Sequence, residues 1–114
     1  MGDDFNFDEA MKLIRSRDAM SFENGYWWLM PQAPHYVEQL VQAMQTEEEP
    51  GMRARFVELL GDTHDSTVIP VLQSELRHPS REVREWAVLA LEELGIPEAA
   101  SLALAYKTAH PEEW

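Results

Sequence analysis

The clearest pattern in the chain is a stripe of apolar residues that recurs with a helical period between positions 83 and 95. It consists of Val83, Trp86, Ala87, Ala90, Leu91 and Leu94. Spacings of three and four residues place these side chains on one broad face of an α-helix. Gly95 follows where a residue in the left-handed conformation would close the helix. Because a face this wide must be covered by other helices, the pattern predicts a layered all-α structure with Trp86 in its core.

The same period, interrupted by Gly and Pro, divides the rest of the chain into further helices. We expect six helices, close to residues 6–20, 34–44, 52–60, 68–76, 81–94 and 97–110. Their alternation with short breaks predicts three antiparallel pairs. Residues 21–34 contain Asn24-Gly25, Pro31 and Pro34, and this run of turn-forming residues predicts an irregular connection.

The dipeptide Leu-Gly ends two of these helices, at residues 60–61 and 94–95, which are 34 residues apart. A period of this length is typical of helical solenoids, in which each helix pair packs on the next. The sequence Val-Arg-x-x-Ala-x-x-Ala-Leu-x-x-Leu-Gly over residues 83–95 resembles the first helix of a HEAT repeat, notably the short HEAT-like repeats related to phycobilisome lyases. The resemblance extends over about residues 52–110.

This resemblance implies a short right-handed α-solenoid of about three antiparallel helix pairs. It would form a single domain over residues 1–114, in line with the length of the chain. Residues 50–110 would hold two better-formed repeats, and residues 1–45 a diverged helix pair that caps the N-terminal end.

Such solenoids present one curved face to a partner, formed by the second helix of each pair. On the expected layout this face would carry Glu38, Gln42, Gln73, Arg77 and Ser101, flanked by the turn residues Asp62 and Asp65.

The segment Tyr26-Trp27-Trp28 is a second candidate for partner contact. On one helix the two tryptophans would point about 100° apart, so both are difficult to bury there. In a connection they would either cover the open end of the core or stand out as binding anchors, a role in which Tyr and Trp are enriched.

Charge narrows the range of partners. The chain has 21 Asp and Glu against nine Lys and Arg, a net charge of −12. This surface repels nucleic-acid phosphates and should attract a basic protein; the plainer interpretation is that the acids serve solubility.

No apolar run reaches the ~20 residues that span a bilayer, no signal-peptide pattern opens the chain, and it has no Cys. We therefore expect a cytoplasmic protein without nucleic-acid or membrane partners.

Candidate chemistry is sparse. Asp62, His64 and Asp65 could approach one metal ion, but the repeat requires a turn there, and Asp65 is placed to cap the next helix. No catalytic motif is recognisable, so no enzyme activity, cofactor or metal is expected.

We expect a small protein-binding module that docks a basic protein. Its size and charge suggest a bacterial immunity or inhibitor protein that neutralises a toxin. The alternative, implied by the resemblance, is an accessory or chaperone subunit of an enzyme complex.

Overall fold

The computed structural model describes residues 5–114, and this part of the chain is all-helical, as predicted. The helices are α1 (Phe7–Ile14), α2 (Ala19–Leu29), α3 (Val37–Thr46), α4 (Pro50–Gly61), α5 (Ile69–Glu75), α6 (Arg81–Glu93) and α7 (Pro97–Ala109). Three short 3₁₀-helices accompany them: η2 (Met30–His35), η3 (Ser66–Val68) and η4 (Pro111–Glu113).

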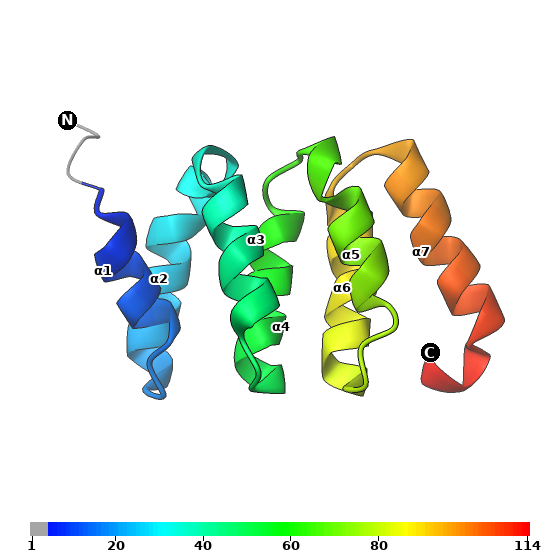
Figure 1. The fold of residues 1–114 in the computed structure, drawn as a ribbon, viewed down its shortest axis with the longest axis horizontal. Helices are drawn as coiled ribbons and strands as arrows, with labels where there is room; N and C mark the ends of the chain where they lie inside the picture. The colour runs from blue at the N-terminus through cyan, green and yellow to red at the C-terminus, as the bar shows by residue number, and fades with distance from the viewer. Residues whose placement is uncertain (1–4) are drawn as a thin grey trace.

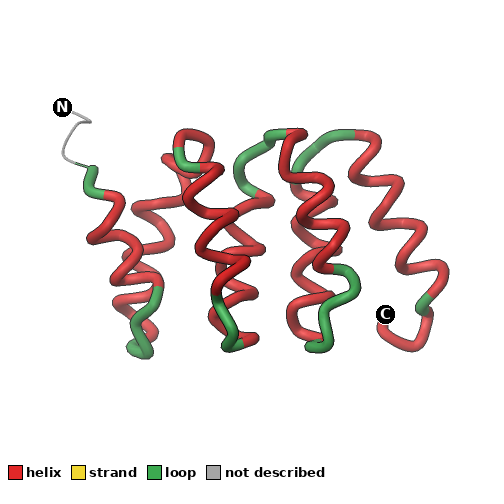
Figure 2. The backbone as a smooth tube through the Cα atoms, viewed as in Figure 1, coloured by secondary structure: helices red, strands yellow, loops and turns green. Residues whose placement is uncertain are grey.

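The helices form two rows. In Figure 1, α1, α3, α5 and α7 lie in the front row and run downward, whereas α2, α4 and α6 lie behind them and run upward. Short connections alternate between the two ends of the stack (Figure 2). The molecule is accordingly elongated, with principal extents of 45 × 27 × 21 Å. Its architecture is that of a solenoid of antiparallel helix pairs.

The prediction of an irregular connection over residues 21–34 is wrong, because most of this segment is α2 and the rest is η2. Asp18 caps α2 by accepting a hydrogen bond from the Ser21 amide at 2.9 Å. Gly25, expected in a turn, is buried where α2 crosses α1. A Cβ at this position would lie 2.5 Å from the Cβ of Leu13. The glycine therefore permits a close helix crossing instead of a chain reversal.

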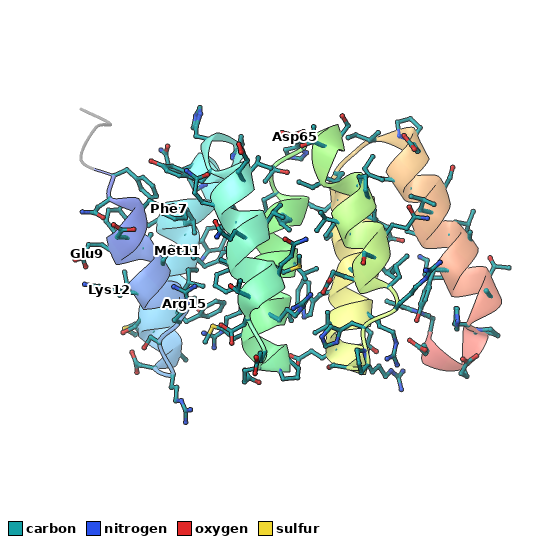
Figure 3. The ribbon with its side chains drawn as sticks, viewed as in Figure 1. Phe7, Glu9, Met11, Lys12, Arg15 and Asp65 are labelled. Atoms are coloured by element: carbon teal, nitrogen blue, oxygen red, sulfur yellow. The ribbon has the colours of Figure 1, made fainter. Side chains whose placement is uncertain are left out.

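The additional helix changes how the helices pair. The pairs are α1 with α2, α3 with α4, and α5 with α6, while α7 packs against α6. Residues 7–46 thus contain three helices and not the single pair expected for the N-terminal region. Helix α1 turns Met11 toward α3, whereas Glu9 and Lys12 point away from the stack (Figure 3). This end of the solenoid is therefore polar on its outer side.

The core follows the boundary between the rows. Five of the six residues in the α6 stripe are buried. Trp86, which was predicted to be a core residue, is only partly buried, and Val88 is fully buried beside the stripe instead. The reason is that α4, α5 and α7 all pack against α6. Its buried surface is therefore wider than the predicted stripe, and Trp86 lies at the edge of that surface.

The closest approach between the central helices joins α4 and α6. A Cβ placed on Gly61 would lie 2.8 Å from the Cα of Ala90 and 3.0 Å from its Cβ. Real Cβ atoms are not found this close to other carbon atoms, so α4 and α6 reach their observed separation only because position 61 has no side chain.

An ion pair joins α4 to α5. The guanidinium of Arg53 donates two hydrogen bonds to the Glu75 carboxylate, at 2.7 and 2.8 Å. The two side chains are only 16% and 7% exposed. Arg53 also donates to the carbonyl oxygens of Gln45 and Glu47, between α3 and α4. One arginine therefore connects two successive helix pairs.

We expect Gly61→Ala to destabilise the protein by about 1–3 kcal/mol, the usual cost of overfilling a packed contact. Helix propensity alone predicts the opposite sign, because Ala is favoured over Gly by about 1 kcal/mol inside a helix. Urea unfolding followed by circular dichroism measures the change. Gly51→Ala in the same helix is the control, since its added methyl group meets only the flexible Glu49 carboxylate. A Gly61→Ala protein as stable as the wild type would show that this contact is not tight.

Candidate functional site

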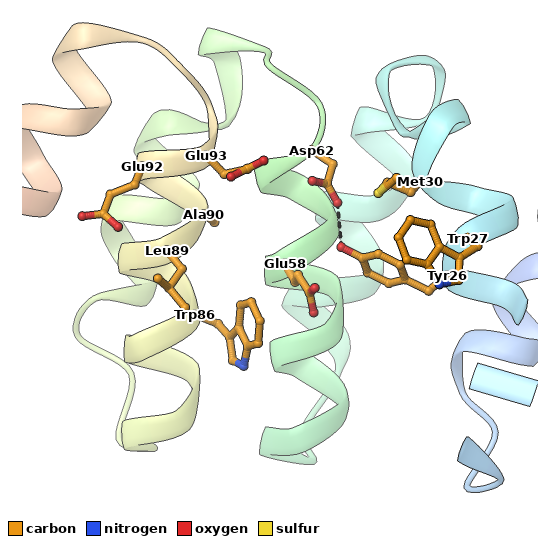
Figure 4. Close-up of a pocket in the computed structure, with 10 residues that line it drawn as sticks. All are labelled: Tyr26, Trp27, Met30, Glu58, Asp62, Trp86, Leu89, Ala90, Glu92 and Glu93. Atoms are coloured by element: carbon orange, nitrogen blue, oxygen red, sulfur yellow. Dashed lines mark hydrogen bonds between the residues drawn. The ribbon is translucent and has the colours of Figure 1, made fainter. Parts of the chain in front are cut away.

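A groove opens between α2, α4 and α6, on the face turned away from the viewer in Figure 1. Figure 4 shows it from its open side. The groove has a volume of about 500 Å³. Its apolar and aromatic lining residues are Tyr26, Trp27, Met30, Trp86, Leu89 and Ala90. Its acidic lining residues are Glu58, Asp62, Glu92 and Glu93.

The aromatic walls come from α2 and α6. Tyr26 and Trp27 pack edge to face, with ring centroids 6.1 Å apart, so each helps to position the other. Trp27 nevertheless remains 62% exposed. Trp86 extends from α6 on the other side of the groove (Figure 4). A flat ligand group could therefore stack on an indole face with little rearrangement.

Two carboxylates of α4 lie between these walls. Glu58 and Asp62 are four residues apart and therefore share one face of the helix. The hydroxyl of Tyr26 donates a hydrogen bond to Asp62 Oδ2 at 2.7 Å. Burial raises the pKa of Asp62; the Tyr26 hydrogen bond opposes this rise, and nearby Glu93 adds to it. The pKa of Glu58 is also raised, mainly by burial.

The pKa of the Tyr26 hydroxyl is raised strongly, first by burial and then by its hydrogen bond to Asp62. The phenol thus stays protonated and serves as a fixed donor that orients Asp62. It has no role as a base.

The negative charge of the groove is poorly balanced. Glu92 pairs with Lys107 of α7 at 2.6 Å. Among residues 5–114, no ion pair involves Glu58, Asp62 or Glu93, and no basic residue lines the groove. The site therefore combines aromatic surface with carboxylates that have no cationic partner, a combination that suits a positively charged group.

Three of the residues predicted to bind a partner meet in this groove: Tyr26, Trp27 and Asp62. Trp28 does not join them. Its ring packs edge to face against Phe5, with centroids 5.2 Å apart, and it is 38% exposed. The two adjacent tryptophans thus point to different surroundings, as expected for neighbours on one helix.

The other predicted residues lie elsewhere. Glu38 and Gln42 are on α3, Gln73 is on α5, Arg77 follows α5, and Ser101 is on α7; all five are exposed. They share the front row of Figure 1, formed by α3, α5 and α7, and so lie on the side of the stack opposite the groove. Their role in binding stays a prediction.

Asp65 is at a connection between the rows (Figure 3), where its carboxylate accepts a hydrogen bond from the Thr67 amide at 2.8 Å. It thus caps η3, close to its predicted role as a cap of the following helix. In residues 5–114, no three His, Asp or Glu side chains gather as metal ligands. No helix within the same residues is long and apolar enough to cross a membrane.

Sequence reasoning missed Glu58, Trp86, Leu89 and Glu93 as groove residues. Trp86 was assigned to the core, and the other three were given no role in binding. One signal was present: Trp86, Ala90 and Glu93 are spaced i, i+4 and i+7, on one face of α6. Nothing in the sequence, however, indicated that this face lies beside Glu58 of α4.

The stacked helix pairs define a helical-repeat protein with an acidic, aromatic groove on one row of helices. The HEAT repeat family matches residues 37–113, from α3 to η4, and the chain belongs to this family. The family resemblance inferred from the sequence is thereby confirmed; its finer form, a relation to phycobilisome lyases, stays a prediction. Comparisons with curated proteins and with solved structures found no match.

We expect Glu58→Gln to stabilise the protein at neutral pH. The pKa of Glu58 lies above its ordinary value of 4.5 in the folded state. The folded state therefore binds this proton more tightly than the unfolded chain, and stability falls as pH rises through the raised pKa. The glutamine variant lacks this loss, so its advantage should disappear below the ordinary pKa.

Thermal unfolding of both proteins between pH 4 and pH 8 measures the effect. Glu98→Gln, an exposed substitution in the first turn of α7, is the control and should change stability by less than about 0.5 kcal/mol. Equal stability of wild type and Glu58→Gln at every pH would show that the Glu58 carboxylate is fully solvated.

Proposed function

We propose that this protein is a protein-binding module that docks a basic protein in the groove between α2, α4 and α6. The observation that carries the proposal is the placement of unpaired carboxylates, above all Glu58, among aromatic side chains. HEAT repeats generally mediate protein–protein interactions and generally serve as scaffolds without catalytic activity. The family and the groove chemistry therefore support the same kind of function.

Long-range electrostatics supports a basic partner. A net charge of −12 on 114 residues produces a negative field that speeds encounter with a cationic surface and that salt weakens. The groove adds short-range specificity, because its exposed aromatic side chains can serve as anchors once the partner has arrived.

A more specific form of the proposal is an immunity or inhibitor protein that covers the cationic active surface of a toxin. The small size, the acidity and the acidic groove support it, because an enzyme that acts on nucleic acid must itself carry positive charge. A captured partner with nuclease activity, blocked by one equivalent of this protein, would bear out this form.

Affinity capture from a lysate of the source organism should recover a basic protein in stoichiometric amount, with partial loss at high salt. The double variant Glu58→Gln/Glu93→Gln should lose this protein. The matched variant Glu48→Gln/Glu98→Gln removes the same charge at exposed positions outside both the groove and the predicted face, and should retain it. A third variant, Gln42→Ala/Gln73→Ala/Ser101→Ala, tests the face predicted from the sequence.

Loss of the partner only with the third variant would assign binding to the α3, α5 and α7 row and refute the groove. Recovery of a large multisubunit enzyme would favour the alternative, an accessory subunit. Retention of an acidic partner, or of the same proteins by all variants, would contradict docking in the acidic groove.

Trp27→Ala should speed dissociation of the captured partner by about tenfold or more, as expected for loss of an aromatic anchor. The melting temperature should change little, because Trp27 is 62% exposed. Surface plasmon resonance and thermal unfolding provide the two measurements, with Trp28→Ala as the neighbouring control. Unfolding of the Trp27→Ala protein would instead assign this ring to the core.

A further inference from the structure

Long-range attraction to a basic partner would need only exposed acids on the surface. Glu58, however, is partly buried among aromatic side chains. From this arrangement we propose that the groove holds one arginine side chain of the partner, with its guanidinium stacked on Trp86 and hydrogen-bonded to Glu58. This inference rests on the proposed function and names the chemical group that the groove selects.

The position of Glu58 supports a cationic occupant. In Figure 4 its carboxylate lies between Trp86 on one side and Tyr26 and Trp27 on the other, and all four residues line the same groove. The Tyr26 hydroxyl has a single proton, which it donates to Asp62. Tyr26 also lies near Glu58 and lowers the pKa of its carboxyl group, but burial outweighs this effect. Among residues 5–114, no basic side chain forms an ion pair with Glu58.

Desolvation makes this charge costly. Burial is the largest influence on Glu58, and it raises the pKa of the carboxyl group. An apolar side chain in the groove would bury the charge further without compensation, and an anion would be repelled. A cation would instead pair with it. A positively charged occupant uses both the carboxylate and the aromatic walls, and it also compensates the buried charge.

Arginine fits this setting better than lysine. Its guanidinium is planar, so it can stack on an indole face and donate two hydrogen bonds at its edge at the same time. An ammonium group is compact and more strongly hydrated, so it loses more on leaving water. The indole of Trp86 supplies the stacking face, and Glu58 supplies the acceptors. Neighbouring Asp62 adds negative charge one helical turn away.

The test uses the four tryptophans as separate reporters, because each indole N–H gives its own signal in a ¹H–¹⁵N NMR spectrum. The full-length protein is titrated with N-acetylarginine amide, N-acetyllysine amide and N-acetylnorleucine amide at equal ionic strength. Trp86 and Trp27 should shift with the arginine compound. Trp28, which packs on Phe5, should not shift. Trp114 is not used as a reference, because Lys107 beside its ring pairs with the groove residue Glu92.

The arginine compound should bind about two- to fivefold more tightly than the lysine compound, as expected for the stronger stacking. Glu58→Gln should weaken the arginine response about three- to tenfold, while Glu98→Gln should leave it unchanged. If Glu58→Gln does not fold, Glu93→Gln provides a second variant. It should weaken binding of the arginine compound less, because Glu93 is exposed at the rim of the groove. Folding is checked by the unchanged signal of Trp28.

Several results would overturn the proposal. An equal response to norleucine would identify an apolar groove, and tighter binding of lysine would reject guanidinium stacking. Equal shifts of all four indoles, or none at millimolar arginine amide, would show that there is no selective site. If capture of a basic partner still depends on Glu58 and Glu93 in that case, docking in the groove stands and only the arginine assignment fails.

Discussion

The contact between Gly61 of α4 and Ala90 of α6 is the constraint on which the rest of the structure depends. It sets the distance between the two helices that make the largest contributions to the core, including the fully buried Phe56 and Leu91. It also fixes the groove, because Glu58 and Asp62 extend from α4 whereas Trp86 and Leu89 extend from α6. A side chain at position 61 would therefore alter the core and the site together.

The basic residues of the chain serve mainly to hold the stack together, and this leaves the acids to define the surface. Arg53 joins α4 to Glu75 of α5, and Arg84 donates to the carbonyl oxygens of His78 and Pro79 at the start of α6. Arg55 stacks over Phe22 with its guanidinium carbon 4.0 Å from the ring centroid. Because these cations are engaged inside the fold, Glu58, Asp62 and Glu93 of the groove have no ion-pair partner among residues 5–114. Because these arginines hold the helices together, they do not neutralise the negative charge of the groove.

The fold could be predicted from the sequence wherever the helical period was strong, as in α6, where only Trp86 of the apolar stripe escaped burial. The prediction failed at α2. In this helix hydrophobicity does not indicate which side is buried, because Trp27 is exposed whereas Gly25 is buried. Gly25 there indicated a turn, although it serves a close helix crossing. This error left the helix pairing wrong at the N-terminal end, although the expected binding residues Glu38, Gln73 and Ser101 do share the row of α3, α5 and α7, on the side of the stack opposite the groove. Side-by-side placement of Glu58 and Trp86 depends on tertiary packing that no local pattern encodes.

Stability and binding make opposite demands on Glu58. A carboxylate that is half-buried, with a raised pKa and no ion-pair partner in the described part of the chain, residues 5–114, weakens the folded state at neutral pH. Residues that serve only the fold do not show this pattern: Glu75, which is buried as well, is paired with Arg53. Glu75 lies on α5 and Glu58 on α4, and the two acids differ in whether the fold supplies a counter-charge. In one case the chain provides its own guanidinium. In the other the guanidinium has to come from another molecule, and the aromatic side chains around Glu58 provide the surface on which it can stack.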